Sequence, residues 1–84
     1  MAAKVVIYSK TYCPYCDRAK ALIKGKGLSY EEISVDEDPA LYAKLKADTG
    51  MMTVPQIFIN DKLVGGFSEL SALDKQGELD NMLK

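Results

Sequence analysis

Two cysteines separated by two residues are the part of this chain most able to do chemistry. Cys13-Pro14-Tyr15-Cys16 follows shortly after the apolar run Val5-Val6-Ile7-Tyr8. We expect Cys13 to cap a helix and Pro14 to take its first position, where a missing N–H costs nothing. The backbone N–H groups of Tyr15 and Cys16 then point at the Cys13 sulfur, and the helix dipole favours its thiolate by up to ~2 kcal/mol. This spacing predicts a thiol pair that cycles between dithiol and disulfide.

The two thiols are expected to play different parts. A sulfur held as a thiolate is a nucleophile and a good leaving group, so Cys13 is suited to forming and breaking mixed disulfides. Lys10, three residues earlier, adds a positive charge nearby. Cys16 falls on the same side of the helix but deeper, so its thiol should stay protonated. We therefore expect Cys13 to attack and Cys16 to resolve.

Two other interpretations of the pair are a structural disulfide and half of a metal site. The chain has only these two cysteines and no histidine, whereas a structural zinc site usually takes four Cys or His ligands. A disulfide that closes so short a loop restricts the unfolded chain little. Redox catalysis is favoured over both alternatives, and no metal site is expected.

Size and charge limit the remaining possibilities. Residues 1–84, of which 48% are hydrophobic, suffice for one small domain without a second catalytic domain. The formal net charge of -1 gives no electrostatic reason to expect nucleic acid or an anionic membrane as a partner. Met1-Ala2-Ala3-Lys4 runs directly into the first strand, and no apolar segment reaches the length of a signal-peptide core or a membrane span. A cytoplasmic location is therefore expected, where a lone thiol pair is more often catalytic than structural.

The thiol pair must be positioned by the elements on either side of it. Residues 4–9 form an apolar strand with no polar side, which predicts a central place in a sheet. The helix opened by Cys13 is expected to run to about Lys24. Its expected inward residues are Cys16, Ala19, Leu22 and Ile23, and its expected outward residues are Asp17, Lys20 and Lys24.

A second strand and helix follow. Residues 28–35 predict a strand, and the acidic pair Glu31-Glu32 favours an edge position for it. Asp38 and Pro39 then give a cap and a first helical residue, and the helix should end at Gly50. Its expected inward face consists of Leu41 and Leu45 together with Ala40, Ala43 and Ala47.

The last third of the chain changes pattern. Residues 56–59 and 62–64 are short apolar runs separated only by Asn60-Asp61, which predicts an antiparallel hairpin with positive φ in its turn. Gly65-Gly66 ends the hairpin, and Ser68 is expected to cap the next helix. That helix and the tail after Gly77 offer the apolar residues Leu70, Leu73, Leu79, Met82 and Leu83. The predicted order is βαβαββα with a terminal helical turn, an α/β fold.

With Cys13-Pro14-Tyr15-Cys16, Thr53-Val54-Pro55 and Gly65-Gly66 in this order, the chain resembles the glutaredoxins along essentially its whole length. The resemblance implies a thioredoxin-like fold with a four-stranded mixed sheet flanked by helices. It also implies a cis Val54-Pro55 bond lying against the thiol pair, with the Val54 backbone free to pair with a peptide-like substrate. From the residues alone, a trans proline that opens an edge strand is the more frequent reading of Pro55.

The same resemblance implies a site for glutathione, a peptide with two carboxylates and one amine. Lys10 and Gln56 would face the glycyl carboxylate, Tyr15 would border the cleft, and Thr53, Val54 and Pro55 would hold the middle. The corner of Gly66, Phe67 and Ser68 would take the γ-glutamyl carboxylate on backbone N–H groups and hydroxyl, and Glu69 would accept from the ammonium. From the residues alone, helix capping by Ser68 and a first-turn acid at Glu69 are equally open interpretations.

The chain also departs from the family pattern in two places. Many relatives have Gly-Gly-Cys-Asp-Asp where this chain has Gly65-Gly66-Phe67-Ser68-Glu69, and many carry a basic or polar residue where this chain has Met51-Met52. Both changes remove a charge from the expected glutathione site and predict weaker binding. Met51 and Met52 are interpreted either as an adaptable apolar rim for protein substrates or as packing beneath a loop.

The leading hypothesis is a glutathione-dependent thiol-disulfide oxidoreductase that acts as a monomer in electron transport and cell redox homeostasis. Glutathione is then a co-substrate, with no tightly bound cofactor. The expected partners are disulfide-containing or glutathionylated proteins, with ribonucleotide reductase as one candidate. Two alternatives remain open: a carrier of an iron-sulfur cluster bridged between two copies, which Pro14 argues against, and a thioredoxin-like enzyme served by a flavoprotein reductase.

Overall fold

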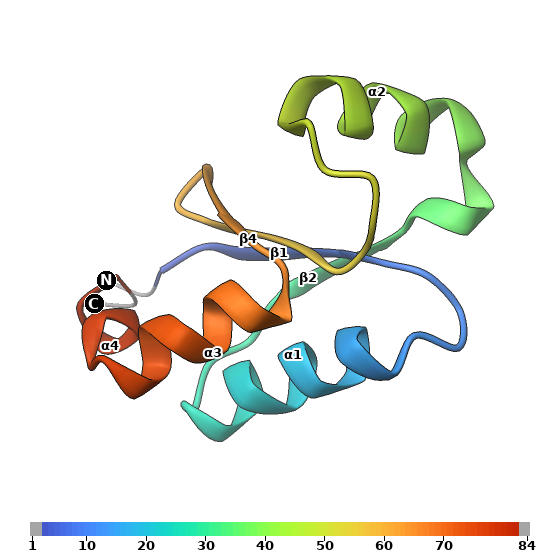
Figure 1. Cartoon of the computed structure of the whole chain (residues 1–84). Coiled ribbons are helices and arrows are strands. Elements are labelled where there is room, and N and C mark those ends of the chain that lie inside the picture. Colours follow the sequence, from blue (N-terminus) through green and yellow to red (C-terminus); the bar gives the residue numbers. More distant parts are fainter. Residues whose placement is uncertain (1–2, 83–84) are drawn as a thin grey trace.

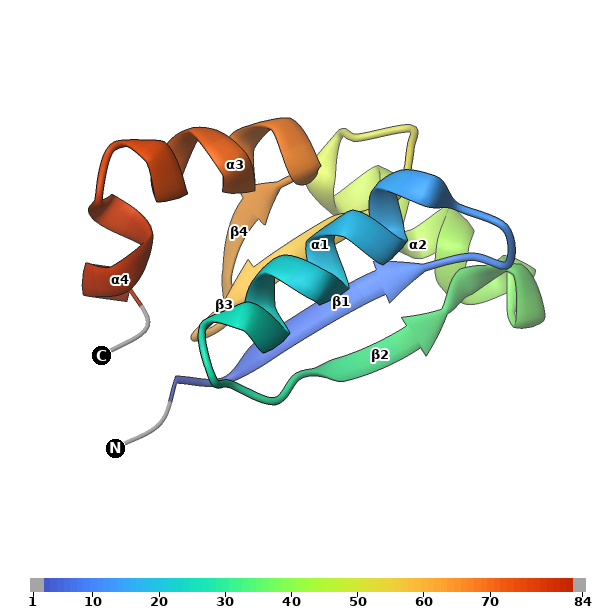
Figure 2. The ribbon, with the colours of Figure 1, turned by 90° about the horizontal axis from the view of Figure 1, so that it is seen from below.

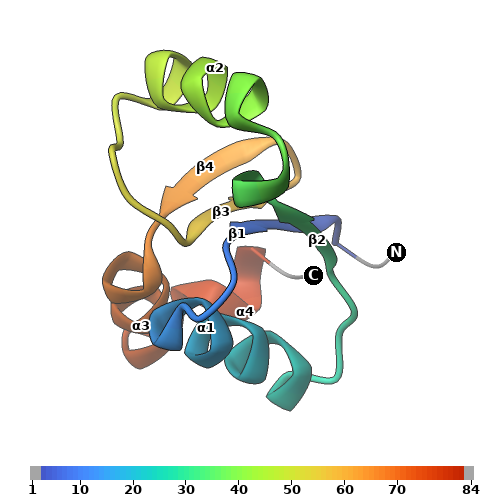
Figure 3. The same cartoon turned by 90° about the vertical axis from the view of Figure 1, so that its right-hand side faces the viewer.

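The computed structural model describes residues 3–82 as a four-stranded sheet covered on both faces by helices. The strand order is β2-β1-β3-β4. Helix α2 lies alone on one face, while α1 and α3, followed by α4, lie on the other (Figures 1 and 3). The predicted mixed four-stranded sheet flanked by helices is confirmed.

The elements follow the predicted order closely. The strands are β1 (Val5–Ser9), β2 (Glu31–Ser34), β3 (Gln56–Ile59) and β4 (Lys62–Gly65). The helices are α1 (Pro14–Gly25), the 3-10 turn η1 (Val35–Glu37), α2 (Pro39–Thr49), α3 (Phe67–Lys75) and α4 (Glu78–Met82). The terminal helical turn is thus confirmed for its described part, while Met1, Ala2, Leu83 and Lys84 lie outside the described residues.

Strand β1 lies at the centre of the sheet, as its apolar sequence predicts. It pairs in parallel with β2 and antiparallel with β3. Side chains alternate along a strand, so Val5, Ile7 and Ser9 share the face toward α1, and Val6 and Tyr8 share the face toward α2. The main core lies on the α1 side, and its buried members are Val5, Ile7, Ala19, Ile23, Ile57, Ile59, Leu70 and Leu79.

Helix α1 starts where the sequence predicts. Cys13 is the N-cap in an extended conformation, and Pro14 takes the first helical position. The inward residues Cys16, Ala19 and Ile23 are buried as expected. Lys20 does not point to solvent as expected, because its ammonium folds back to an ion pair with Glu32 and leaves the side chain 22% exposed.

Helix α2 has the predicted ends but only part of the predicted inward face, since Leu45 is buried and Leu41 half-buried. Asp38 caps it by accepting from the Leu41 N–H at 3.1 Å, and Gly50 ends it with φ of 76°. The buried residue of the helix is Leu45, and the three alanines expected beside it are exposed. An alanine carries too little apolar area to determine which side of a helix turns inward, so the larger leucine and the half-buried Tyr42 decide it.

Strand β2 is shorter than predicted. It covers residues 31–34 because it pairs only with residues 6–9 of β1, and residues 28–30 form a loop. Val35, expected at the end of the strand, is buried and instead begins η1, where its carbonyl accepts from the Asp38 N–H at 3.2 Å. The predicted edge position of β2 is confirmed.

The hairpin and the helix after it agree with the prediction in outline. Asn60 and Asp61 both have positive φ, 52° and 67°, as a tight two-residue turn requires. The cap of α3 is Gly66 rather than Ser68, so that prediction is wrong. The Gly66 carbonyl accepts the first helical bond from Leu70 at 3.1 Å, which places Ser68 already inside the first turn.

The two ends of the described chain lie together at one end of the molecule. The loop that leads from β1 into α1 lies at the opposite end (Figures 1 and 2). Among residues 3–82, none of the helices combines the length and apolar character needed to cross a bilayer.

Candidate active site

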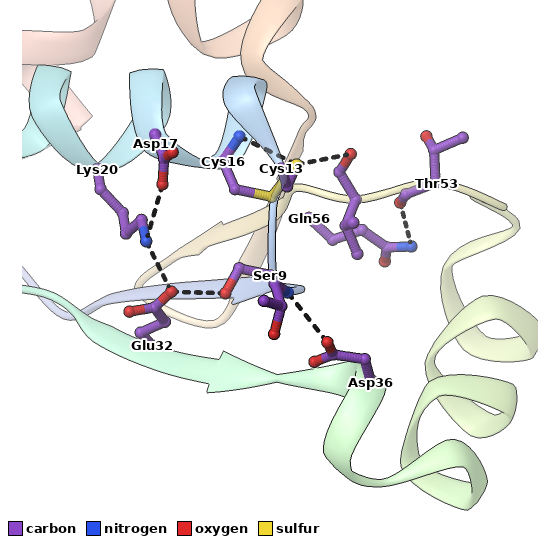
Figure 4. The surroundings of a disulfide bond; sticks show 11 residues. Ser9, Cys13, Cys16, Asp17, Lys20, Glu32, Asp36, Thr53 and Gln56 are labelled. Carbon is purple, nitrogen blue, oxygen red and sulfur yellow. Dashed lines mark hydrogen bonds and ion pairs between the residues drawn. A yellow bond between two sulfur atoms is a disulfide. The ribbon is translucent and has the colours of Figure 1, made fainter.

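The two sulfurs meet at the start of α1, where Cys13 and Cys16 form a disulfide with Cα atoms 5.2 Å apart. Cys13 is 7% exposed and Cys16 only 1%. Of the two amides expected to face the first sulfur, that of Cys16 donates to Cys13 Sγ at 3.2 Å. The pair, drawn in Figure 4, thus has the predicted asymmetry, with Cys16 the more buried of the two residues.

Burial gives Cys16 a distinct chemistry when it is a thiol. Desolvation first, and then a hydrogen bond with Cys13, raise the pKa of Cys16 to about 12. The backbone amide of Lys10 and the charge of Lys20 oppose that shift. A thiol in this position is a poor nucleophile until something removes its proton.

The Val54-Pro55 peptide bond is cis, and it lies against the thiol pair as the family resemblance implies. Cys13 Sγ lies 3.9 Å from the carbonyl oxygen of Val54. Pro55 is buried and Val54 is half-buried, so the bend is held in place by packing. The backbone of residues 53–55 therefore forms one side of the entrance to the Cys13 sulfur.

A cleft of about 210 Å³ opens beside this bend. Its lining residues are Tyr15, Met51, Thr53, Val54, Pro55, Gly66, Phe67, Ser68 and Glu69. The cleft thus brings together residues from the start of α1, the loop before β3 and the start of α3. Eight of these nine residues were predicted from the sequence as glutathione contacts, and Met51 was interpreted either as part of an apolar rim or as packing beneath a loop.

Aromatic and charged groups shape the walls of this cleft. The rings of Tyr15 and Phe67 lie 6.2 Å apart between centroids, and the Arg18 guanidinium lies 5.1 Å from the centroid of Tyr15. Glu69 accepts from the Gly66 N–H at 3.4 Å, so its carboxylate is turned toward the start of α3. Gly65, with φ of 123°, has no room for a side chain, since a Cβ there would come within 2.9 Å of Glu69.

Lys10 and Gln56 do not line the cleft. Lys10 is exposed, and its charge contributes to lowering the pKa of Asp36, after the hydrogen bonds from Thr11. Gln56 is fully buried on the face of the sheet toward α2. The amide of Gln56 donates to the carbonyls of Met51 and Thr53 at 3.1 and 3.0 Å and accepts from the Thr49 hydroxyl at 2.9 Å.

This hydrogen-bonded group holds the loop that carries the cleft. We call Gln56, Thr49 and the carbonyls of Met51 and Thr53 the loop cluster. The Thr49 hydroxyl also accepts from the Met51 N–H at 3.1 Å, so both ends of the turn between α2 and Thr53 are tied. This cluster was not predicted from the sequence, although a buried glutamine next to apolar strand residues is a signal that its amide must find partners.

The two methionines differ in their environment. Met51 is half-buried and lines the cleft, whereas Met52 is 69% exposed. The Met52 carbonyl accepts from the Tyr42 hydroxyl at 3.2 Å, which ties this part of the loop to α2. Packing beneath a loop is thus the wrong interpretation for Met52, whereas the apolar rim stays a prediction for both residues.

Comparison with known proteins gives consistent matches. Residues 5–64 match the family model described as Glutaredoxin. The chain is 48% identical to glutaredoxin 3 of Escherichia coli strain K12 over 82 residues, which cover 98% of this chain and 99% of that protein. It is also 48% identical to a glutaredoxin of Pseudomonas aeruginosa over 79 residues, 94% of each chain.

Solved structures agree with the sequence matches. A buckwheat glutaredoxin in complex with glutathione has a TM-score of 0.91 and 38% identity, covering 96% of this chain and 76% of its own. A glutaredoxin from Brucella melitensis has a TM-score of 0.88 and 44% identity, covering 99% of this chain and 90% of its own.

Proposed function

Because the chain belongs to the glutaredoxin family of thiol-disulfide oxidoreductases, we propose that it uses glutathione to reduce protein disulfides and glutathione mixed disulfides. Cys13 is the attacking thiol and Cys16 the resolving thiol. The observation that carries this assignment is the difference between the two sulfurs. Cys13 caps α1 beside an open cleft, whereas Cys16 is 1% exposed and has a strongly raised pKa.

The reaction proceeds through two exchanges. The Cys13 thiolate attacks the substrate disulfide, forms a mixed disulfide and releases one thiolate of the substrate, which takes up a proton. Cys16 then loses its proton, attacks Cys13 and expels the second thiolate, leaving the Cys13–Cys16 disulfide that the structure contains. Two molecules of glutathione reduce that disulfide and leave as glutathione disulfide.

Glutathione occupies the cleft beside the cis proline in this proposal. Thr53 and the Val54 backbone hold its middle, and Tyr15 and Pro55 border it. The amides of Phe67 and Ser68 in the corner after Gly66, with the Ser68 hydroxyl, receive the γ-glutamyl carboxylate, because the first turn of a helix offers unpaired N–H groups. Glu69 receives the ammonium. Support comes from the lining of the cleft and from the similarity to a glutaredoxin solved with glutathione.

Gln56 has a different role in the proposed site from the direct ligand contact that the sequence predicts. Both ends of its amide are engaged within the loop cluster, so it acts on glutathione only by holding residues 51–53. Lys10 remains the candidate for the glycyl carboxylate, since it is exposed and close in sequence to Cys13. Its flexible side chain can reach toward a bound anion from outside the cleft.

The domain organisation, location and partners of the protein are proposed from its family. We propose that residues 1–84 form a single domain that works as a monomer in the cytoplasm. Its partners are disulfide-containing or glutathionylated proteins, among which ribonucleotide reductase is one candidate. The near-complete coverage of glutaredoxin 3 by this chain supports the single domain.

The test is glutathione-coupled turnover with three proteins: wild type, Cys13→Ser and Cys16→Ser. On a small glutathione mixed disulfide, wild type and Cys16→Ser should turn over, and Cys13→Ser should show no activity above background. On a protein disulfide, both variants should be inactive, because the second exchange needs Cys16. Retained activity in Cys13→Ser would contradict the assignment, and so would a requirement for a flavoprotein reductase in place of glutathione.

A further inference from the structure

Four polar side chains form a second cluster on the opposite side of the sheet from the loop cluster. We call Ser9, Asp17, Lys20 and Glu32 the ion cluster. The Ser9 hydroxyl and the Lys20 ammonium both donate to Glu32 Oε2, at 2.7 and 2.9 Å. Lys20 also lies 3.3 Å from Asp17 Oδ1. Figure 4 shows the cluster next to the disulfide, between α1 and the sheet.

The backbone explains why Lys20, Ser9 and Glu32 meet beside Cys16. Lys20 follows Cys16 by one helical turn, so both side chains start from the same side of α1. Ser9 continues the series Val5, Ile7, Ser9 on the face of β1 toward α1 and is 1% exposed. Glu32 is the register partner of Ile7 on β2, so it also faces α1.

The charge of Lys20 therefore acts on a buried sulfur. Water hardly reaches Cys16, and charges interact more strongly in such surroundings than in solution. The polar and charged groups around the sulfur are Cys13, Asp17 and Lys20 of α1, the Lys10 amide after β1 and Glu32 of β2. Lys20 is the cation held in this group, because Glu32 first and then Asp17 raise its pKa.

We propose that Lys20 stabilises the Cys16 thiolate in the resolving step, and that Glu32 fixes the ammonium in place while partly neutralising it. This inference rests on the proposed function, since it concerns the second exchange. In that step the Cys16 proton passes to solvent and the S–S bond between Cys13 and the substrate breaks. The bond between Cys13 and Cys16 forms, and the departing thiolate takes up a proton. Lys20 donates no atom to the reaction.

The test compares variants with opposite changes of charge. Lys20→Met removes the positive charge, and Glu32→Gln removes a negative one while keeping an acceptor oxygen for both Ser9 and Lys20, so that the ammonium stays in place. Each reduced protein is mixed with glutathione disulfide, quenched with acid at short times and analysed by mass spectrometry. This separates the reduced protein, the glutathione mixed disulfide and the intramolecular disulfide, and so gives one rate for each exchange.

We expect the second exchange to slow by about threefold to tenfold in Lys20→Met, and not to slow in Glu32→Gln. The first exchange should stay within about twofold of wild type in both, since Cys13 is on the cleft side. A purely structural role for the cluster would slow both variants. The proposal is overturned if Lys20→Met resolves at the wild-type rate, or if Glu32→Gln is slowed as well.

Lys24→Met is the matched control, since it removes a lysine from the same helix one turn further from Cys16. Lys24 lies over the ring of Tyr30, 5.8 Å from its centroid. The rate of the second exchange in Lys24→Met should match that of wild type. Deglutathionylation by Cys16→Ser is measured alongside. If that activity is absent, the proposed function has failed, whereas if it is present and Lys20→Met is unaffected, only the role of Lys20 has failed.

Discussion

The loop cluster and the ion cluster flank the thiol pair on opposite faces of the sheet, and they differ in kind. The loop cluster is neutral, and its central residue Gln56 is fully buried. The ion cluster contains one cation and two carboxylates, and its side chains range from the buried Ser9 to Asp17, which is 74% exposed. The loop cluster lies next to the cleft beside Cys13, and the ion cluster lies next to Cys16.

This difference matches what each side of the site has to provide. A substrate cleft needs a fixed backbone. A buried side-chain amide that donates to two backbone carbonyls holds that backbone in place, and it does so at any pH because an amide does not titrate. A buried thiol that must ionise needs a nearby charge, and a partly exposed ion pair provides it at little cost in stability. The two clusters therefore predict different responses to substitution, acid and salt.

Among the substitutions in the two clusters, Gln56→Leu should have the largest effect on stability. It keeps the approximate volume but leaves the Met51 and Thr53 carbonyls without their donor, so we expect a loss of roughly 2–4 kcal/mol in the free energy of unfolding. The loop should also loosen and raise KM for a glutathione mixed disulfide. Urea unfolding and steady-state kinetics measure the two effects. Gln76→Leu, at an exposed glutamine after α3, should change stability by less than about 0.5 kcal/mol.

Thr49→Val should weaken the same cluster less. It removes the hydroxyl that bonds Gln56 and the Met51 N–H, and we expect a loss of about 1 kcal/mol in unfolding free energy. Thr49→Ser keeps the hydroxyl and should retain most of that stability. Equal losses in the two variants would mean that the methyl group, and not the hydrogen bonds, supports the loop.

The ion cluster should respond to acid where the loop cluster does not. Lys20, and then Ser9, lower the pKa of Glu32 from its usual value of 4.5. A lowered pKa means that the stabilisation is present above pH 4.5 and is lost as pH falls through the lower value of the folded state. Wild type should therefore lose more stability than Glu32→Gln on acidification from about pH 6 to about pH 3. Parallel losses in urea melts would contradict this.

Asp17→Asn should have the smallest effect. Asp17 is the exposed partner in its pair with Lys20, and exposed helical pairs three residues apart contribute about 0.2–0.5 kcal/mol. We expect an unfolding midpoint close to that of wild type, with a difference that disappears at high salt. A loss above 1 kcal/mol would show that Asp17 belongs to the ion cluster as firmly as Glu32 does.

The sequence correctly predicts the strands, helix and turn that position this site, because strong local signals determine them. The apolar run of β1, the Cys13-Pro14 start of α1 and the Asn60-Asp61 turn each give one conformation a clear advantage, and all three are confirmed. The cis bond at Pro55 was expected only from the family resemblance, since a local sequence favours the trans form.

The sequence predictions are wrong at positions where contacts between distant parts of the chain determine the conformation of a side chain or the end of a helix. Ser68 is a good capping residue, yet the bend after β4 places Gly66 at the cap. Lys20 was expected in solvent, and only the parallel pairing of β1 with β2 brings Glu32 within its reach. Gln56 was expected to face a ligand, and its partners come from a loop whose path the sequence does not specify. Neither polar cluster can be recognised from spacing alone.

The shared location of the described chain ends, opposite the loop that leads into α1, has a practical consequence (Figure 2). A tether or fluorescent reporter attached at either of these described ends would be held away from the thiols. Molecules immobilised on an electrode in this way would keep their reactive sulfur turned toward the solution.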